Sequence, residues 1–219
     1  MNKQNKIRNY SEADLILLYD LKRMVGAENN PLLQEWLNAT TTLNDAEQFM
    51  FRIILDDARQ NIYGWHEEEL KMKFIAFVLR LGELVDTPLY HTYFEKTIST
   101  TIDGHFLKTK TDFMIAKGIL DKPQLPYFHF QEYKPHKRPV GDSMAQLLEA
   151  LLIAQEINQH QFPMYGCEVM GKYWSFVILN DKTYCLSKSY DCTEEDDLLT
   201  IIAILRKFKT ILITQLLKS

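Results

Sequence analysis

The spacing of hydrophobic residues changes along the chain, from a helical period in its first part to alternation in its centre. In the first part, apolar positions recur every three or four residues, which is typical of amphipathic helices. We expect helices at 11–26, 31–38, 44–63 and 66–84. Ser11 is suited to cap the N-terminus of the first helix, and Gly26 is suited to end it.

The centre of the chain has the pattern of strands and turns. Asp-Gly at 103–104 is a turn dipeptide between extended segments, so we expect strands at 105–118 and 126–134 with a loop between them. A helix, three strands and a last helix then follow, at 142–160, 164–171, 172–180, 183–191 and 193–218.

This order of elements predicts an α/β (α+β) fold in which a mixed β-sheet is flanked by helices. It reads helices, then β-β-α-β-β-β, then a helix, with no evident linker. We expect one compact domain. Within it, residues 1–62 would form a helical N-terminal extension packed on a core of residues 63–219.

Composition and charge limit the classes of function. With 46% hydrophobic residues among 219, the chain can bury a large core without disulfides. The net charge of −4 disfavours binding of nucleic acid by overall charge, although a local basic site is compatible with it. Three cysteines without metal-type spacing, no signal peptide and no membrane-length apolar run predict a cytoplasmic protein without a membrane partner.

The segment FHFQEYK at 128–134 places an acid and a base on a strand that begins with apolar residues. Side chains alternate along a strand, so Glu132 and Lys134 share one face. Asp112 lies within the preceding strand, where a charged Asp requires a partner or a metal ion. Neighbouring strands would bring Asp112 and Glu132 side by side, and two close carboxylates repel unless a cation lies between them.

Such a pair of hard oxygen ligands suits Mg²⁺, with Mn²⁺ as a substitute, and the backbone carbonyl of Tyr133 is a further available ligand. A metal ion held by Asp112 and Glu132 could polarise a phosphodiester and lower the pKa of a bound water. Lys134 could orient that water or stabilise the developing negative charge. The residues therefore predict a metal-dependent enzyme that hydrolyses phosphodiester bonds.

Asp112, followed after nineteen residues by Glu132-Tyr133-Lys134 at the end of a strand, resembles the motif of the PD-(D/E)xK nuclease superfamily. The resemblance implies a restriction-endonuclease-like αβββαβ core over roughly residues 66–170. It also implies a magnesium-dependent hydrolase that acts on DNA. The first motif departs from the family pattern, because Thr111 precedes Asp112 where the pattern has proline.

Further site residues follow from the same resemblance. Family members often place a Glu near the metal on the helix before the first strand, where Glu67 is the better match and Glu68 the second. Many also carry a Gln, here Gln146, on the helix after the lysine strand, near the site or the DNA. A basic loop beside the proposed site could bind phosphate, through His136, Lys137 and Arg138.

Each residue also has a purely structural explanation. Glu132 and Lys134 could form an ion pair at a solvated sheet edge, and Asp112 could bond to backbone. Glu67 could complement its helix dipole, and Gln146 and the basic loop could simply be solvated. Two functions therefore stay open: a DNA nuclease, or a catalytically inactive nuclease-fold protein that serves as a nucleic-acid-binding or protein-interaction module. The oligomeric state is open as well, a homodimer included.

Overall fold

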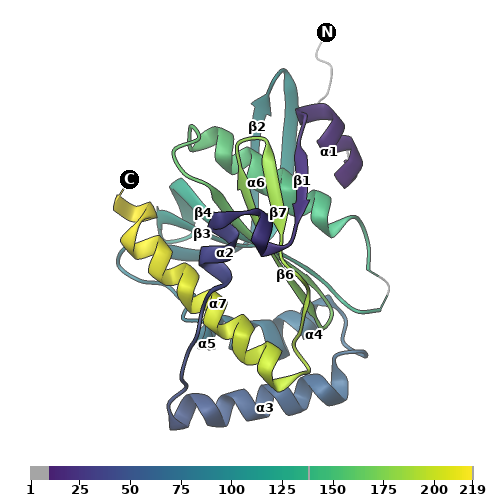
Figure 1. Cartoon of the computed structure of the whole chain (residues 1–219), viewed down its shortest axis with the longest axis vertical. Helices are drawn as coiled ribbons and strands as arrows, with labels where there is room; N and C mark the ends of the chain where they lie inside the picture. The colour runs from purple at the N-terminus through teal and green to yellow at the C-terminus, as the bar shows by residue number, and fades with distance from the viewer. Residues whose placement is uncertain (1–9, 138, 219) are drawn as a thin grey trace.

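An eight-stranded mixed sheet forms the centre of the protein, and helices pack on both of its faces (Figure 1). The structure is a computed structural model that describes residues 10–137 and 139–218. The helices are α1 (Glu12–Tyr19), α2 (Pro31–Leu37), α3 (Asp45–Asn61), α4 (Glu67–Leu70), α5 (Ala76–Leu81), α6 (Ser143–Ile157) and α7 (Glu195–Thr214), with short helical segments η1 (Ala27–Asn29), η2 (Lys71–Ile75) and η3 (Leu216–Lys218).

The strand order across the sheet is β1-β7-β6-β5-β4-β3-β2, and β8 pairs with β6. The strands are β1 (Lys22–Val25), β2 (His91–Ile102), β3 (His105–Ile119), β4 (Lys122–Lys134), β5 (Met164–Met170), β6 (Tyr173–Asn180), β7 (Thr183–Leu186) and β8 (Tyr190–Asp191). β2, β3 and β4 are antiparallel neighbours, whereas β4 and β5 run parallel and are connected through α6. This crossover packs α6 on the sheet, because parallel neighbours require a long connection.

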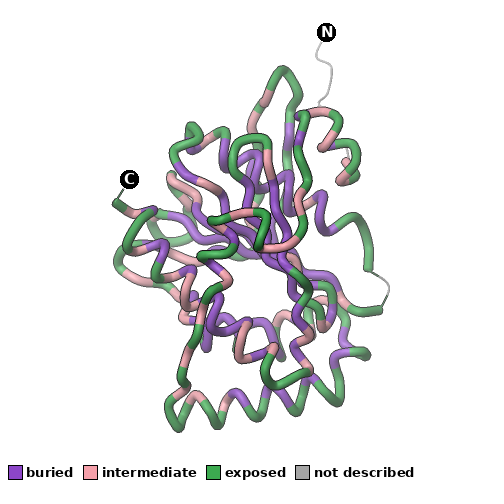
Figure 2. Tube along the Cα trace, in the orientation of Figure 1, coloured by how far each residue is buried: buried purple, intermediate pink, exposed green. Residues whose placement is uncertain are grey.

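The two faces of the sheet are covered by different helices. On one face, Gly166 of β5 lets the α6 side chains Leu147 and Leu151 approach closely. On the other face, the ring of Trp36 from α2 and that of Phe208 from α7 contact the aromatic residues of the central strands. Buried residues consequently concentrate in the central strands and on the helix sides that face them (Figure 2).

The predicted mixed sheet flanked by helices is confirmed, but the predicted order of elements lacked β1 and counted two strands before α6 where the structure has β2, β3 and β4. The helix predicted at 11–26 ends at Tyr19, where Asp20 takes a left-handed conformation, and the chain continues as β1. β1 pairs in parallel with β7, so the first 62 residues supply an edge strand as well as α1, α2 and α3. Pairing with the backbone of β7 outweighed the local helical pattern, which is a tertiary effect.

The loop predicted between the strands at 105–118 and 126–134 is instead a hairpin. β3 runs on to Ile119 and β4 begins at Lys122, with Leu120 at positive φ in the two-residue turn. Pro126 lies where the register between β3 and β4 shifts, between Gln124 and Tyr127, and Pro123 pairs with Gly118 next to the turn. Within the described residues, no helix has the length and apolar character needed to cross a bilayer.

Gly171, in the turn between β5 and β6, supports a first prediction. It has φ +59, and an added Cβ would lie 2.7 Å from Cβ of His136. Gly104 has φ +80 with no atom within 4 Å of an added Cβ. We expect Gly104→Ala to cost about 1 kcal/mol of unfolding free energy for its left-handed backbone, and Gly171→Ala about 3 kcal/mol, because the loop at His136 must also shift. Urea unfolding of the two variants tests this, and equal losses would contradict it.

Candidate active site

Asp112, Glu132 and Lys134 come together where β3 and β4 run side by side. The antiparallel ladder pairs Phe113 with Gln131, so continuing it by one residue places Asp112 opposite Glu132. These three residues are almost completely buried, with 8%, 4% and 7% of the residue surface exposed. The sequence therefore places two acids and one base inside the protein rather than on a solvated edge.

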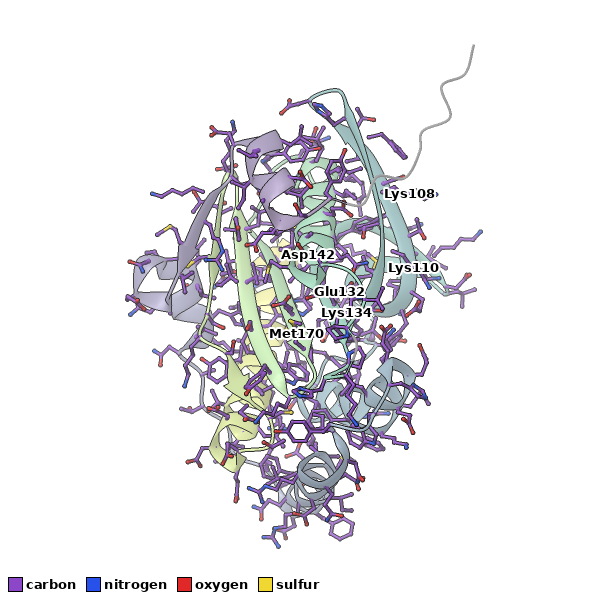
Figure 3. All side chains as sticks on the ribbon, turned by 90° about the vertical axis from the view of Figure 1, so that its right-hand side faces the viewer. Lys108, Lys110, Glu132, Lys134, Asp142 and Met170 are labelled. Carbon is purple, nitrogen blue, oxygen red and sulfur yellow. The ribbon has the colours of Figure 1, made fainter. Side chains whose placement is uncertain are left out.

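Backbone and side-chain hydrogen bonds hold this group in place. The Tyr133 N–H donates to Oδ2 of Asp112 at 2.8 Å. Where the β3–β4 ladder ends, this carboxylate oxygen therefore takes the place of a backbone carbonyl as the acceptor. The Lys134 ammonium donates to Oε1 of Glu132 at 2.7 Å. Figure 3 shows Glu132 and Lys134 next to each other on β4.

The opposite face of β4 also carries polar side chains, and these are buried and close enough to one another to form hydrogen bonds. The Tyr133 hydroxyl donates to Oε1 of Gln131 at 2.6 Å, and the Gln131 amide lies 2.9 Å from Nε2 of His129. The exposed surface of each of these three residues is 1% or less. A strand that is buried on both sides cannot shift its register without burying unpaired polar groups, which fixes where Glu132 and Lys134 point.

The two acids lie in an environment that opposes their ionisation. Burial raises the pKa of Glu132 to about 8, the charge of Asp112 adds to the increase, and Lys134 opposes it. Burial also raises the pKa of Asp112, and the hydrogen bonds from Lys71 and from the Tyr133 N–H oppose that shift. A further cation beside the two carboxylates would relieve this cost of charge.

Lys71 was not among the residues that the sequence pointed to, yet it lies at the centre of the acidic cluster. Its Nζ is 2.7 Å from Oδ1 of Asp112, 2.8 Å from Oε1 of Glu67 and 2.8 Å from Oε1 of Glu95. Burial lowers the pKa of Lys71, but hydrogen bonds to the three carboxylates outweigh burial and raise this pKa above its usual value. Glu95 also pairs with Lys110 of β3.

Only one contact of this cluster can be predicted from the spacing of residues in the sequence. Glu67 and Lys71 are four residues apart, a spacing at which helical side chains of opposite charge meet. Asp112 and Glu95 lie on strands that approach the helix only in the folded protein. Glu67 joins the cluster, whereas Glu68 has a side chain that is 74% exposed and 3.9 Å from Lys71.

The remaining predicted residues lie outside this cluster. Gln146 of α6 lines a cavity of about 480 Å³ together with Lys108 and Lys110, and its buried Oε1 accepts no hydrogen bond within the described part of the chain. His136 and Lys137 are exposed in the loop that follows β4. Arg138 lies outside the described residues.

The donor set of the site fits a magnesium ion. Within residues 10–137 and 139–218, no group of three or more His, Cys, Asp and Glu side chains is arranged to hold a metal ion. Mg²⁺ needs fewer protein ligands, because it commonly binds one or two carboxylates together with water and substrate phosphate. Asp112 and Glu132 supply that number of hard oxygen ligands. The Lys71 ammonium beside Asp112 demonstrates that the cluster accommodates a positive charge.

Comparison with known proteins adds no family assignment, since no family model matches the chain and no curated protein matches it.

The role of Lys71 as counter-ion leads to a second prediction. We expect Lys71→Met to lower the free energy of unfolding by about 3 kcal/mol, because it leaves the buried Asp112 carboxylate without its partner. Lys73→Met is the matched control, since Lys73 pairs with Glu69 on the same helical stretch but is 52% exposed. That variant should change the stability by less than about 1 kcal/mol. Denaturant unfolding at neutral pH provides the comparison, and similar losses in both variants would refute the role of Lys71.

The raised pKa of Glu132 leads to a third prediction. An acid with a pKa of about 8 in the folded protein and an ordinary value in the unfolded chain stabilises the fold in its protonated form. This contribution is complete below the ordinary pKa and is lost as the pH rises toward 8. In metal-free buffer, the wild type should therefore lose stability relative to Glu132→Gln between pH 5 and pH 8. If the unfolding free energies of the two proteins change equally over this range, the raised pKa of Glu132 is excluded.

Proposed function

We propose that the protein is a metal-dependent nuclease that hydrolyses phosphodiester bonds of DNA at Asp112, Glu132 and Lys134. The observation that supports this most is the buried group itself, in which two carboxylates and a lysine converge at adjacent strands. A buried cluster of this kind is costly as a purely structural device, because each charge must be desolvated and compensated. A functional role, in which the cluster holds a metal ion and positions a scissile phosphate, would explain why the protein tolerates this desolvation cost.

The order of elements supports the proposal as well. The helical stretch α4–η2–α5, the antiparallel strands β2, β3 and β4, the crossover helix α6 and the parallel strand β5 follow one another along the chain. This is the αβββαβ order of PD-(D/E)xK nucleases, the restriction-endonuclease-like core that we propose here. Asp112 and the Glu132–Lys134 pair occupy the second and third strands of that order.

Each residue has a defined role in the proposed reaction. Asp112 and Glu132, with the carbonyl of Tyr133, would hold Mg²⁺ or Mn²⁺, which polarises the phosphate and acidifies a bound water. Lys134, oriented by its 2.7 Å hydrogen bond to Glu132, would stabilise the negative charge that develops on the phosphate. Lys71 balances the charge of Asp112, and Glu67 in turn forms an ion pair with Lys71.

Cleavage assays test the proposal directly. Linear duplex, circular duplex and single-stranded DNA are incubated with Mg²⁺, with Mn²⁺ or with EDTA. We expect cleavage that depends on the metal ion and falls by at least about 100-fold in Asp112→Asn and in Lys134→Ala. Lys209→Met is the control, because Lys209 forms a comparable 2.6 Å ion pair with Glu83 on another part of the protein. Equal rates for the wild type and the two site variants would exclude this function.

The ion pair between Lys71 and Asp112 favours a second function. If the ammonium group permanently takes the place of the metal beside Asp112, the fold would bind nucleic acid or protein without cleaving DNA. The negative net charge of the chain agrees with the protein-interaction form of such a module. DNA retained in a binding assay, and left intact with Mg²⁺ and with Mn²⁺, is the outcome expected for this function.

A further inference from the structure

A second cavity opens directly beside the candidate catalytic residues. It measures about 420 Å³, within the size range of sites for small molecules. Its lining includes Glu168 and Met170 of β5, Tyr173 and Ser175 of β6, and Ser189. None of these residues has a role in the cleavage chemistry described above.

The sheet register fixes the distance between this cavity and the catalytic group. Glu168 pairs with Glu132, and Met170 pairs with Lys134, in the parallel ladder between β4 and β5. Neighbouring strands lie about 4.8 Å apart, so the cavity begins one strand away from the proposed catalytic lysine. The turn after β5 is fixed as well, because the Gly171 N–H donates to the carbonyl of Lys134 at 2.7 Å. A group in the cavity would therefore be adjacent to a phosphate held at Lys134.

The cavity offers surfaces on which a flat ring can pack. Tyr173 is 43% exposed and Met170 is 39% exposed, although both lie beside a tightly packed core. The Lys172 ammonium lies 5.0 Å from the centre of the Tyr173 ring and 5.7 Å from that of Tyr63. This cation restrains the tyrosine ring, which lowers the entropy lost when a base stacks on it.

The polar groups of the cavity suit an uncharged partner that carries hydrogen-bond donors. The hydroxyls of Ser175 and Ser189 lie 3.0 Å apart. Ser143 donates to Oε1 of Glu168, and no described side chain donates to the other oxygen of that carboxyl group. Among the described residues, the lining contains the acid Glu168 and the imidazole of His136 but no lysine or arginine, so the interior beside Glu168 is not suited to phosphate.

We propose that this cavity receives one unstacked base of the DNA strand, next to the phosphate that is cleaved. The inference rests on the proposed nuclease function and extends it to the substrate. A base inside a duplex cannot reach such a cavity unless it leaves the stack, so the substrate is single-stranded DNA or a frayed end. Glu168 selects a base with an amino group, because its carboxylate accepts from the exocyclic amine of cytosine and has no such donor on thymine.

Binding measurements with Ca²⁺ in place of Mg²⁺ test this inference without cleavage. The probes are fluorescent twelve-nucleotide strands of dC and of dT and a duplex of the same length, followed by anisotropy. We expect the dC strand to bind more tightly than the duplex and the dT strand. Tyr173→Ala should weaken binding of the dC strand roughly tenfold, whereas Tyr173→Phe, which keeps the ring, should bind like the wild type.

Two further variants complete the design. Glu168→Gln should abolish the preference for dC over dT. Phe49→Ala is the control for loss of an exposed aromatic ring, because Phe49 is 69% exposed on α3, and it should bind like the wild type. Equal affinity of Tyr173→Ala and the wild type, or a duplex bound as tightly as the single strand, would overturn the inference. If Lys134-dependent cleavage persists under that outcome, the nuclease proposal stands and only the base site is lost. If no DNA is bound or cleaved, both proposals fail.

Discussion

Compensation of buried charge where the middle of β3 runs beside the end of β4 is the constraint on which the candidate site depends. Asp112 and Glu132 lie inside the protein, where an uncompensated carboxylate costs several kcal/mol. Lys71 approaches Asp112 and Lys134 approaches Glu132, each to 2.7 Å. The two cations come from different elements, so the site is complete only when the helical stretch α4–η2–α5 is docked on the sheet.

The two lysines do not fully compensate the negative charge of the Asp112 and Glu132 carboxylates. The pKa of Glu132 stays raised to about 8 despite Lys134, because burial and the neighbouring Asp112 outweigh the single lysine. A divalent cation supplies the missing charge more effectively than a further side chain, since it can contact both acids at once. The same imbalance of charge is the physical reason why we propose a metal ion at this cluster.

The topology around the site separates two surfaces that a substrate can contact. The segment that joins β4 to α6 lines one cavity with Gly141 and Asp142, beside Lys108 and Lys110. Its beginning lines the other cavity with Pro135 and His136, beside Glu168 and Tyr173. Among the described residues, Lys108 and Lys110 border the first cavity and no lysine or arginine borders the second, so the first is better suited to contact phosphates.

The alternating pattern of FHFQEYK, and an Asp within a neighbouring strand, predicted that Asp112 lies beside Glu132 and Lys134, and the structure places the three residues on adjacent strands. Both are local signals, because alternation along a strand decides which side chains share a face. The same local reasoning extended the first helix into β1 and placed a loop where β3 and β4 form a hairpin. In both places the pairing with a distant strand decided the conformation.

The sequence by itself determined the mixed sheet flanked by helices, and the alternation that puts Glu132 and Lys134 on one face, since both depend on residues near in the chain. Only the tertiary structure decided that Lys71 and Glu95 join Asp112, and that Glu168 and Tyr173 border Lys134. These contacts connect residues that are tens of positions apart. No periodicity records such a contact, because it depends on how the packed sheet and helices are placed in space.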